Sequence, residues 1–430
     1  MQLEVPSYAE VDNQDLAQKN KIAKWTFIFY MCADNNLESA AIQDINEMEA
    51  AEFDESEINI LALLDRSEFY DDSNGNWTGT RLLKISHDAA GVNNKIISPE
   101  IACEDLGISL GTEKELDMAD YNNLSALLNF CCRNYAAEHY ALIIWGHGTG
   151  YRSFQLSDFG TQTKVRAVAV DGSSGNFMET PNLRKAIESG MKRKLDFLGF
   201  DTCFASELEE LYELRNCTLY FAGSEGTQSE SGWDYKEWFS ENIAACTDGL
   251  SLCRLLENQH IQKEDSTFAI IEMSKIEKVF TAFDSFAIQA SHIVKNKSVG
   301  SEIKEKLFLQ KRAFRVYNSM TNPLYLDIFE LSQNLLVFDS SLERVSENLL
   351  SALKSATKNR QWKSEAFYPI GIYFCSFDEN NQLIEDFSSY YKHGSGAVNQ
   401  CMFVQESVGY VFTESKSGTL LDRLFENYNF

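Results

Sequence analysis

The chain lacks any long hydrophobic run and is poor in positive charge. No stretch of its 430 residues reaches the roughly 18 apolar residues that a membrane-spanning helix needs. Residues 1–22 are polar, and the first apolar run, residues 25–33, is too short for a secretory signal. The 38 basic residues face 64 acidic ones, and the net charge of −26 opposes binding to a phosphate backbone. We therefore expect no membrane span and no nucleic-acid partner. A cytoplasmic location and secretion with a trimmed signal both stay open.

Two common functional patterns are also absent. The ten cysteines form no Cys-x-x-Cys pair, and none has the spacing to a histidine that a zinc site needs. A chain of this size needs no disulfide scaffold, so we expect most cysteines to be buried free thiols. The segment after the first apolar run reads CADNNLE, without the glycines of a phosphate-binding loop. The sequence therefore predicts neither a metal site nor a nucleotide site.

Short apolar runs alternate with amphipathic segments over the first half of the chain. This alternation predicts an α/β fold whose mainly parallel sheet is covered by helices on both faces. Turn residues before residue 80 predict a hairpin at one sheet edge. We expect strands near residues 25–33, 58–65, 80–86, 139–145, 166–171, 195–200, 218–224 and 367–375, and helices near residues 37–53, 113–137, 181–191, 206–215 and 342–356.

The pattern becomes mostly helical from about residue 235. Residues 342–356 show this well, because their leucines fall on one helical face. We therefore divide the chain into a polar N-terminal arm (1–22), an α/β domain (23–255) and a mostly helical C-terminal region (256–430). The C-terminal region either packs on the α/β domain or continues it.

Two strand ends carry the side chains of cysteine-protease chemistry. One apolar run stops at a Gly-His-Gly sequence centred on His147, and another stops at Asp-Thr-Cys, which ends in Cys203. Because the carboxyl ends of parallel strands meet at one edge of a sheet, we expect the imidazole and the thiol in one crevice. The histidine comes 56 residues before the cysteine, close to the order and gap of caspases. The pair predicts a nucleophile, Cys203, and its base, His147.

The backbone around this pair suits acyl transfer. Glycines on both sides of His147 permit a sharp, exposed turn. Cys203 precedes a predicted helix, whose N-terminal N–H groups and dipole are expected to lower the pKa of the thiol. Thiolate attack on a carbonyl also requires donors for the oxyanion, and we expect the N–H groups of Gly148 and Cys203 to supply them.

Asp201 is the candidate for substrate recognition. It lies two residues before Cys203, so strand alternation places both side chains on one side. A carboxylate there would pair with an Arg or Lys side chain of a peptide, and the alternative is a structural aspartate at a strand end. Asp201→Lys is expected to abolish a preference for basic residues, and an unchanged preference would remove Asp201 from the pocket.

The chain also resembles the clostripain family of cysteine peptidases, relatives of caspases, gingipains and legumains. The resemblance rests on FYMCADNNLESAAIQDINEME (29–49), IIWGHGTGYR (143–152), RAVAVD (166–171), LDFLGFDTC (195–203) and SGWDY (231–235), with a weaker match in YPIGIYF (368–374). It implies a caspase-like αβα sandwich, with a more helical C-terminal half. It also implies a His–Cys dyad that cleaves after Arg or sometimes Lys. By position, His147 is then the base, Cys203 the nucleophile and Asp201 an acid of the specificity pocket.

The resemblance carries further expectations. Some members cleave themselves between the dyad residues, and Lys164 is the preferred site here. The second pocket wall reads SEGTQSESGWDY (224–235), with its acidic positions shifted from the family pattern. Glu225 or Glu230 is expected to contribute a carboxylate there, and Trp233 belongs to the same wall. The resemblance implies no required cofactor, although calcium activates some members. The sequence contains no EF-hand pattern, so it does not locate a calcium site. The expected partner is a peptide or protein with a basic residue, and the oligomeric state is not indicated.

A non-catalytic binding or regulatory protein with the same fold is the alternative from another class. Both dyad residues are present, which favours the enzyme. Alkylation of Cys203 separates the two hypotheses, because it inactivates a peptidase and leaves a binding module nearly unchanged.

Overall fold

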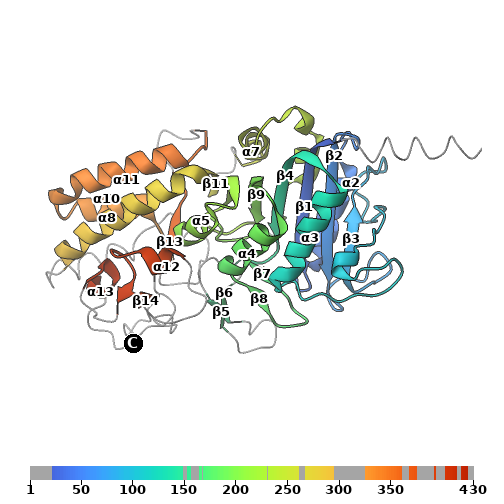
Figure 1. The fold of residues 1–430 in the computed structure, drawn as a ribbon, viewed down its shortest axis with the longest axis horizontal. Coiled ribbons are helices and arrows are strands. Elements are labelled where there is room, and N and C mark those ends of the chain that lie inside the picture. The colour runs from blue at the N-terminus through green and yellow to red at the C-terminus, as the bar shows by residue number, and fades with distance from the viewer. Residues whose placement is uncertain are drawn as a thin grey trace, which may run out of the picture.

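The computed structural model describes residues 22–148, 153–155, 164–166, 168–229, 231–260, 267–294, 325–360, 368–374, 392–393, 402–413 and 418–424. Its sheet-containing part and its helical part lie side by side along the long axis of the molecule (Figure 1). Within these residues, no helix combines the length and the apolar character that crossing a membrane would require.

A seven-stranded sheet forms the centre of the α/β part. Its strands are β1 (Ala23–Ala33), β2 (Ile58–Arg66), β3 (Gly79–Lys84), β4 (Ala137–Trp145), β9 (Leu195–Asp201), β10 (Thr218–Ser224) and β11 (Phe268–Glu272). Their order across the sheet is β11-β10-β9-β4-β1-β2-β3. The five inner strands are parallel, and the two edge strands, β11 and β3, run antiparallel to their neighbours. The sheet is therefore mainly parallel, as predicted.

Helices cover both faces of this sheet, because its inner strands are apolar on both sides. In β1, Tyr30 and its alternate neighbours belong to one buried cluster, whereas Phe29 and its alternates belong to another. The first face is covered by α3 (Tyr121–Asn134), α4 (Thr180–Gly190) and α5 (Leu208–Leu214). The second is covered by α2 (Glu38–Ala50), α6 (Tyr235–Ser240) and α7 (Gly249–Asn258). The result is the predicted αβα sandwich.

Short strand pairs lie outside the central sheet. They are formed by β5 (Ser153–Gln155) with β6 (Lys164–Arg166), β7 (Ala169–Val170) with β8 (Phe177–Met178), β12 (Tyr325–Asp327) with β13 (Gly371–Tyr373), and β14 (Lys392–His393) with β15 (Phe412–Thr413). The first two pairs lie in the chain between the strands that carry His147 and Cys203.

The helices of the C-terminal region share a hydrophobic core with the α/β part. They are α8 (Ile276–Val294), α10 (Ile328–Leu336), α11 (Glu343–Ala356), α12 (Met402–Glu406) and α13 (Leu420–Leu424). Their apolar side chains belong to the same buried cluster as those of α3, α4 and α5. Polar contacts add to this: Arg360 Nε lies 2.7 Å from Glu257 Oε2, and the Gly371 N–H donates to the Ser206 carbonyl at 2.9 Å. The helical region thus extends the core on the α5 side of the sheet (Figure 1).

The predicted elements differ from the observed ones mainly at their ends. Helix α3 is shorter than predicted because it starts at a cap, where the Asp120 side chain accepts from the Asn122 N–H. The strand expected at 166–171 is reduced to β7, which pairs with β8 and not with the central sheet. Strand β11 was not predicted, and it completes the sheet from beyond residue 255. The division of the chain at residue 255 stays a prediction.

Candidate active site

A pocket of about 280 Å³ opens at the carboxyl edge of the central sheet. The end of β4 contributes His147 to its wall, and the end of β9 contributes Asp201 and Cys203. The segment after β10 closes another side with Gln228 and Gly232. The structure therefore brings the predicted base, nucleophile and pocket acid into one cavity.

A tight turn after β4 presents the histidine. Gly146 has φ +139°, and a Cβ there would lie 2.9 Å from the Cys32 carbonyl oxygen, so a side chain does not fit. Burial lowers the pKa of His147 below its ordinary value of 6.5. The imidazole is therefore neutral at pH 7, the state in which it can accept a proton.

Asn36 contacts this histidine, and sequence reasoning missed it. Its Oδ1 lies 2.8 Å from His147 Nε2. A carboxamide oxygen accepts, so Nε2 carries the proton of the neutral ring and Nδ1 is its basic nitrogen. Asn36 follows β1, the neighbour of β4 in the sheet. An Asp-Asn-Asn sequence before a predicted helix is typical of a helix cap, but no side-chain cap bond is present at α2, which begins at Glu38.

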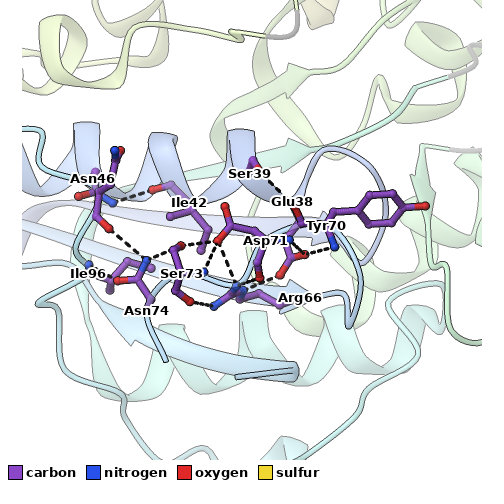
Figure 2. A network of polar contacts seen from close by, with 11 residues as sticks. Glu38, Ser39, Ile42, Asn46, Arg66, Tyr70, Asp71, Ser73, Asn74 and Ile96 are labelled. Carbon is purple, nitrogen blue, oxygen red and sulfur yellow. Dashed lines mark hydrogen bonds and ion pairs between the residues drawn. The ribbon is translucent and has the colours of Figure 1, made fainter. Parts of the chain in front are cut away.

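A buried ion pair fixes the start of α2 directly after Asn36 (Figure 2). Arg66 Nε donates to Glu38 Oε1 at 2.7 Å, and both side chains are fully buried. Glu38 Oε2 accepts from the Asp71 N–H at 2.9 Å, and Arg66 Nη2 donates to the Asp71 carbonyl at 2.7 Å. Burial raises the pKa of Glu38, and the bond from Arg66 opposes that rise. The network holds the first turn of α2, and with it Asn36, against the end of β2.

Cys203 lies just past β9, half-buried. The Gln228 N–H donates to its Sγ at 3.3 Å. Burial raises the pKa of the thiol above its ordinary value of 9.0, the Gln228 N–H opposes this, and the charge of Asp201 adds to it. The predicted helix begins only at Leu208, after a stretch whose N–H groups bond to β10. The prediction that a helix N-terminus lowers the pKa of this thiol is therefore wrong.

The backbone next to Cys203 is strained and closely packed. Phe204 has φ +51°, a conformation that costs a bulky residue about 1–3 kcal/mol. Its ring stacks on Tyr325, with ring centroids 5.1 Å apart. A Cβ at Gly148 would collide with the Thr202 side chain and the Cys203 carbonyl, so only glycine fits there. This close approach places Gly148 beside the cysteine segment; the oxyanion role of the Gly148 and Cys203 N–H groups stays a prediction.

Asp201 is buried at the pocket wall and held by two donors. Its Oδ2 accepts from the Trp233 N–H at 3.0 Å and from the Tyr235 hydroxyl at 2.8 Å. Gly232 covers it with φ +56°, and a Cβ at that position would lie 2.6 Å from the same oxygen. The carboxylate therefore has a fixed position at the pocket wall.

Two further acidic side chains, Asp44 and Glu47, lie near Asp201 behind the pocket wall. The Trp145 indole N–H donates to Asp44 Oδ2 at 2.6 Å. Burial, and then the charge of Asp201, raise the pKa of Asp44 well above its ordinary value. Glu47 Oε2 accepts from the Tyr235 N–H at 3.2 Å, and burial raises the pKa of Glu47. Sequence reasoning missed both acids, since α2 is remote from Asp201 along the chain.

The other predicted site residues have different positions. Glu225 is buried and does not line the pocket. Its N–H donates to the Thr267 carbonyl, and its charge contributes to the raised pKa of Glu207. Trp233 lies in the core beneath the pocket and contributes its N–H to Asp201 instead of a contact surface. Glu230 lies outside the described residues. Lys164 begins β6, and its role as a cleavage site stays a prediction.

Comparison with known proteins identifies the family to which this chain is similar. A model of the clostripain family matches residues 29–415 of this chain. Among curated proteins, clostripain of Hathewaya histolytica is 32% identical over 216 residues. That match covers 46% of this chain and only 37% of the length of clostripain.

Two solved structures share the fold. A secreted C11 cysteine protease from Bacteroides thetaiotaomicron, in complex with an irreversible peptide inhibitor, has a TM-score of 0.61 at 19% identity. The alignment covers 86% of this chain and 96% of that one. An inactive zymogen C11 protease from Parabacteroides distasonis has a TM-score of 0.57 at 17% identity, with coverage of 82% and 92%. At these sequence identities, the two comparisons show a shared fold and nothing more.

Proposed function

Because this chain belongs to the clostripain family, we propose that it is a cysteine endopeptidase that cleaves peptide bonds after Arg, and also after Lys. Cys203 is the nucleophile, His147 the acid and base, and Asp201 the acid that recognises the basic side chain. The observation that carries the proposal is the shared pocket, which these three side chains line together.

The reaction starts from an uncharged pair. The pKa of the thiol is raised and that of the imidazole is lowered, so both are neutral at pH 7. With Asn36 holding the proton on Nε2, Nδ1 takes the thiol proton as Sγ attacks the peptide carbonyl carbon. The carbonyl oxygen becomes an oxyanion, which the N–H groups of Gly148 and Cys203 are proposed to stabilise.

The same histidine serves both halves of the cycle. When the tetrahedral species collapses, the C–N bond breaks and His147 gives its proton to the leaving amine. A thioester on Cys203 remains. Water then attacks the thioester while His147 takes its proton, and the free acid and the thiol are released.

A basic side chain fits the electrostatics of the pocket. Asp44 and Glu47 lie near Asp201, and burial first, then the charges of Asp201 and Glu47, raise the pKa of Asp44; part of that rise is the energetic cost of bringing acidic groups together. An entering guanidinium or ammonium would offset that cost and form a charge-assisted bond with Asp201. The net charge of −26 also attracts basic peptides toward the molecule.

Hydrolysis of fluorogenic peptides that end in Arg, Lys, Asp or Ala tests the proposal directly, with Cys203→Ala as control. Cleavage after Arg or Lys that vanishes in Cys203→Ala is the expected result. Cleavage after another residue would keep the chemistry and reject the role of Asp201. If no peptide is cleaved, with or without calcium, a non-catalytic binding protein becomes the better hypothesis.

Asp201→Asn separates recognition from chemistry. The amide oxygen can still accept from Trp233 and Tyr235, so the pocket keeps its shape. Loss of the charge is expected to lower kcat/KM for an Arg peptide by about 100-fold. The rate at which iodoacetamide alkylates Cys203 is expected to change by less than about threefold, since this reagent carries no basic group for Asp201 to recognise. An Arg preference that survives in Asp201→Asn would reject the assignment.

We also propose self-cleavage after Lys164. The segment that contains β5 and β6 lies between the two dyad residues in the chain, as a processing loop would. Purified wild type is expected to yield two fragments on a denaturing gel, while Lys164→Ala and Cys203→Ala stay intact. A wild-type chain that stays intact while it cleaves peptides would reject this proposal.

A further inference from the structure

A second cavity lies on the same edge of the central sheet as the candidate active site. It measures about 400 Å³ and is lined by residues between Glu68 and Asn76, in the loop that joins β2 to β3. Because β2 runs parallel to β1, and β1 to β4, this loop leaves the sheet on the edge that carries His147. The sequence predicts only a hairpin turn for this segment, which we call the β2–β3 loop.

The cavity combines exposed aromatic rings with exposed carboxylates. Phe69 and Tyr70 are 82% and 45% exposed, and no other aromatic side chain is exposed in the described part of the protein. Glu68 and Asp72 line the same cavity and are exposed as well. Neither carboxylate belongs to an ion pair between described residues. Aromatic faces and carboxylates both attract an organic cation such as an ammonium or guanidinium group.

Buried polar contacts hold the backbone of this loop in place. Glu38 Oε2 accepts from the Tyr70 N–H at 3.2 Å and from the Asp71 N–H at 2.9 Å. Arg66 Nη2 donates to the Asp71 carbonyl at 2.7 Å, and the side chains of Glu38 and Arg66 are fully buried. The Tyr70 ring points away from this network (Figure 2). A ligand would therefore meet a loop that is already ordered, and little conformational entropy would be lost on binding.

The β2–β3 loop is a neighbour of the candidate active site. Leu37 lines the active-site pocket, and the next residue, Glu38, holds the loop. The strand order β9-β4-β1-β2 places Cys203, His147, Asn36 and then the loop on successive strand ends. Neighbouring strands lie about 4.8 Å apart, and β2 is two strands from β4, so the loop lies roughly 10 Å beyond His147.

The proposed reaction determines which half of the substrate points toward this loop. Cys203 attacks the carbonyl carbon, and His147 gives a proton to the leaving amine, so the amine half begins on the His147 side. Continued in the same direction, that half runs from the end of β4 toward the ends of β1 and β2. An extended peptide spans about 3.3 Å per residue, so roughly the third residue after the cleaved bond reaches the loop.

We propose that the β2–β3 loop binds a Lys or Arg side chain of the substrate, about three residues after the cleaved bond. The inference rests on the proposed peptidase function and adds a second point of recognition to it. The cationic group would form charge-assisted bonds with Glu68 and Asp72 and lie against the ring of Phe69. The preferred substrate is then a peptide with two basic side chains, one bound at Asp201 and the other at the loop.

Peptide binding to full-length Cys203→Ala, measured by fluorescence anisotropy, tests the proposal without cleavage of the probe. Two fluorescein-labelled peptides carry Arg before the target bond and differ only in Lys or Ser at the third position after it. We expect the Lys peptide to bind about tenfold more tightly. Adding Glu68→Gln and Asp72→Asn is expected to reduce this difference to less than about twofold. Adding Phe69→Ala instead is expected to weaken binding of the Lys peptide about threefold.

A matched control separates local recognition from attraction by the net charge of −26. Glu52→Gln with Glu347→Gln, in the Cys203→Ala protein, removes two exposed carboxylates elsewhere and is expected to keep the Lys preference. Circular dichroism checks that every variant is folded.

Two results would overturn the proposal. One is equal affinity of Cys203→Ala for the two peptides, or no binding of either. The other is a Lys preference that survives Glu68→Gln with Asp72→Asn. Cleavage after Arg by wild type, without a loop-dependent preference, would keep the peptidase and reject this site. Loop-dependent binding in a protein whose wild type cleaves no peptide would support the site and reject the peptidase function, so the two failures are distinguishable.

Discussion

The reactivity of Cys203 should depend steeply on pH. Its pKa is raised above 9.0 by burial, and that of His147 is lowered below 6.5, so no thiolate–imidazolium pair forms near neutrality. Below the thiol pKa the thiolate fraction grows tenfold per pH unit, and iodoacetamide reacts with the thiolate. The alkylation rate at Cys203 is therefore expected to rise about tenfold per unit from pH 6 to pH 8. A rate that is constant over this range would indicate a preformed ion pair and contradict the prediction.

Asn36 is expected to act as a positioning residue. Asn36→Ala removes the acceptor for His147 Nε2–H, so the ring loses its fixed orientation and tautomer. We expect kcat to fall about tenfold or more while KM changes less than about twofold. Ser39→Ala serves as the control, because its hydroxyl donates to the Tyr70 carbonyl at the start of α2. Equal losses in both variants, or a change confined to KM, would indicate only a structural role.

The residues that the sequence could identify are those fixed by strand periodicity. His147, Cys203 and Asp201 line one pocket because parallel strands end at one edge and strand residues alternate. Asn36, Gln228 and Asp44 depend on how loops and a helix fold back, which no local pattern specifies. The sign of the thiol pKa shift depended on burial, and sequence position alone could not indicate how deeply Cys203 is covered.

At the scale of elements, the Arg66–Glu38 pair is expected to determine whether α2 stays in place. Arg66→Met leaves the Glu38 carboxylate buried without its cation, a change that typically costs about 3–5 kcal/mol. Urea unfolding followed by tryptophan fluorescence measures the loss. Lys24→Met breaks the exposed pair with Glu138 and is expected to leave the midpoint unchanged within error. A similar midpoint for Arg66→Met and wild type would show that the network is dispensable.

Elements with strong patterns were predictable, and those defined by their partners were not. The strand at Thr218–Ser224 has the predicted bounds, because a continuous apolar run ends in turn residues. Strand β11 has only five residues and is a strand because β10 offers an unpaired edge. Helix α5 starts later than predicted because the N–H groups of Ala205 and Ser206 bond to the Ser224 carbonyl, which delays the first turn.

At the scale of the whole molecule, the shared core predicts unfolding in one step. Apolar residues of α8 and α11 lie in the same buried cluster as those of α3 and α4, so neither part keeps its core alone. Fluorescence of Trp25, Trp145 and Trp238 reports on the sheet, while far-UV circular dichroism reports largely on the helices. The two urea transitions are expected to coincide. Midpoints that differ by more than about 0.5 M would indicate two independent domains.

The stacking of Phe204 on Tyr325 has a consequence for inhibitor design. Phe204 keeps its left-handed backbone next to Cys203, and Tyr325, from the C-terminal region, supports its ring. A small molecule that displaces the Tyr325 ring would let Phe204 relax and would shift Cys203 with it. Such a compound would need neither a basic group nor an electrophile. For the proposed peptidase it would act as a non-competitive inhibitor, because it would displace Cys203 while leaving the pocket empty.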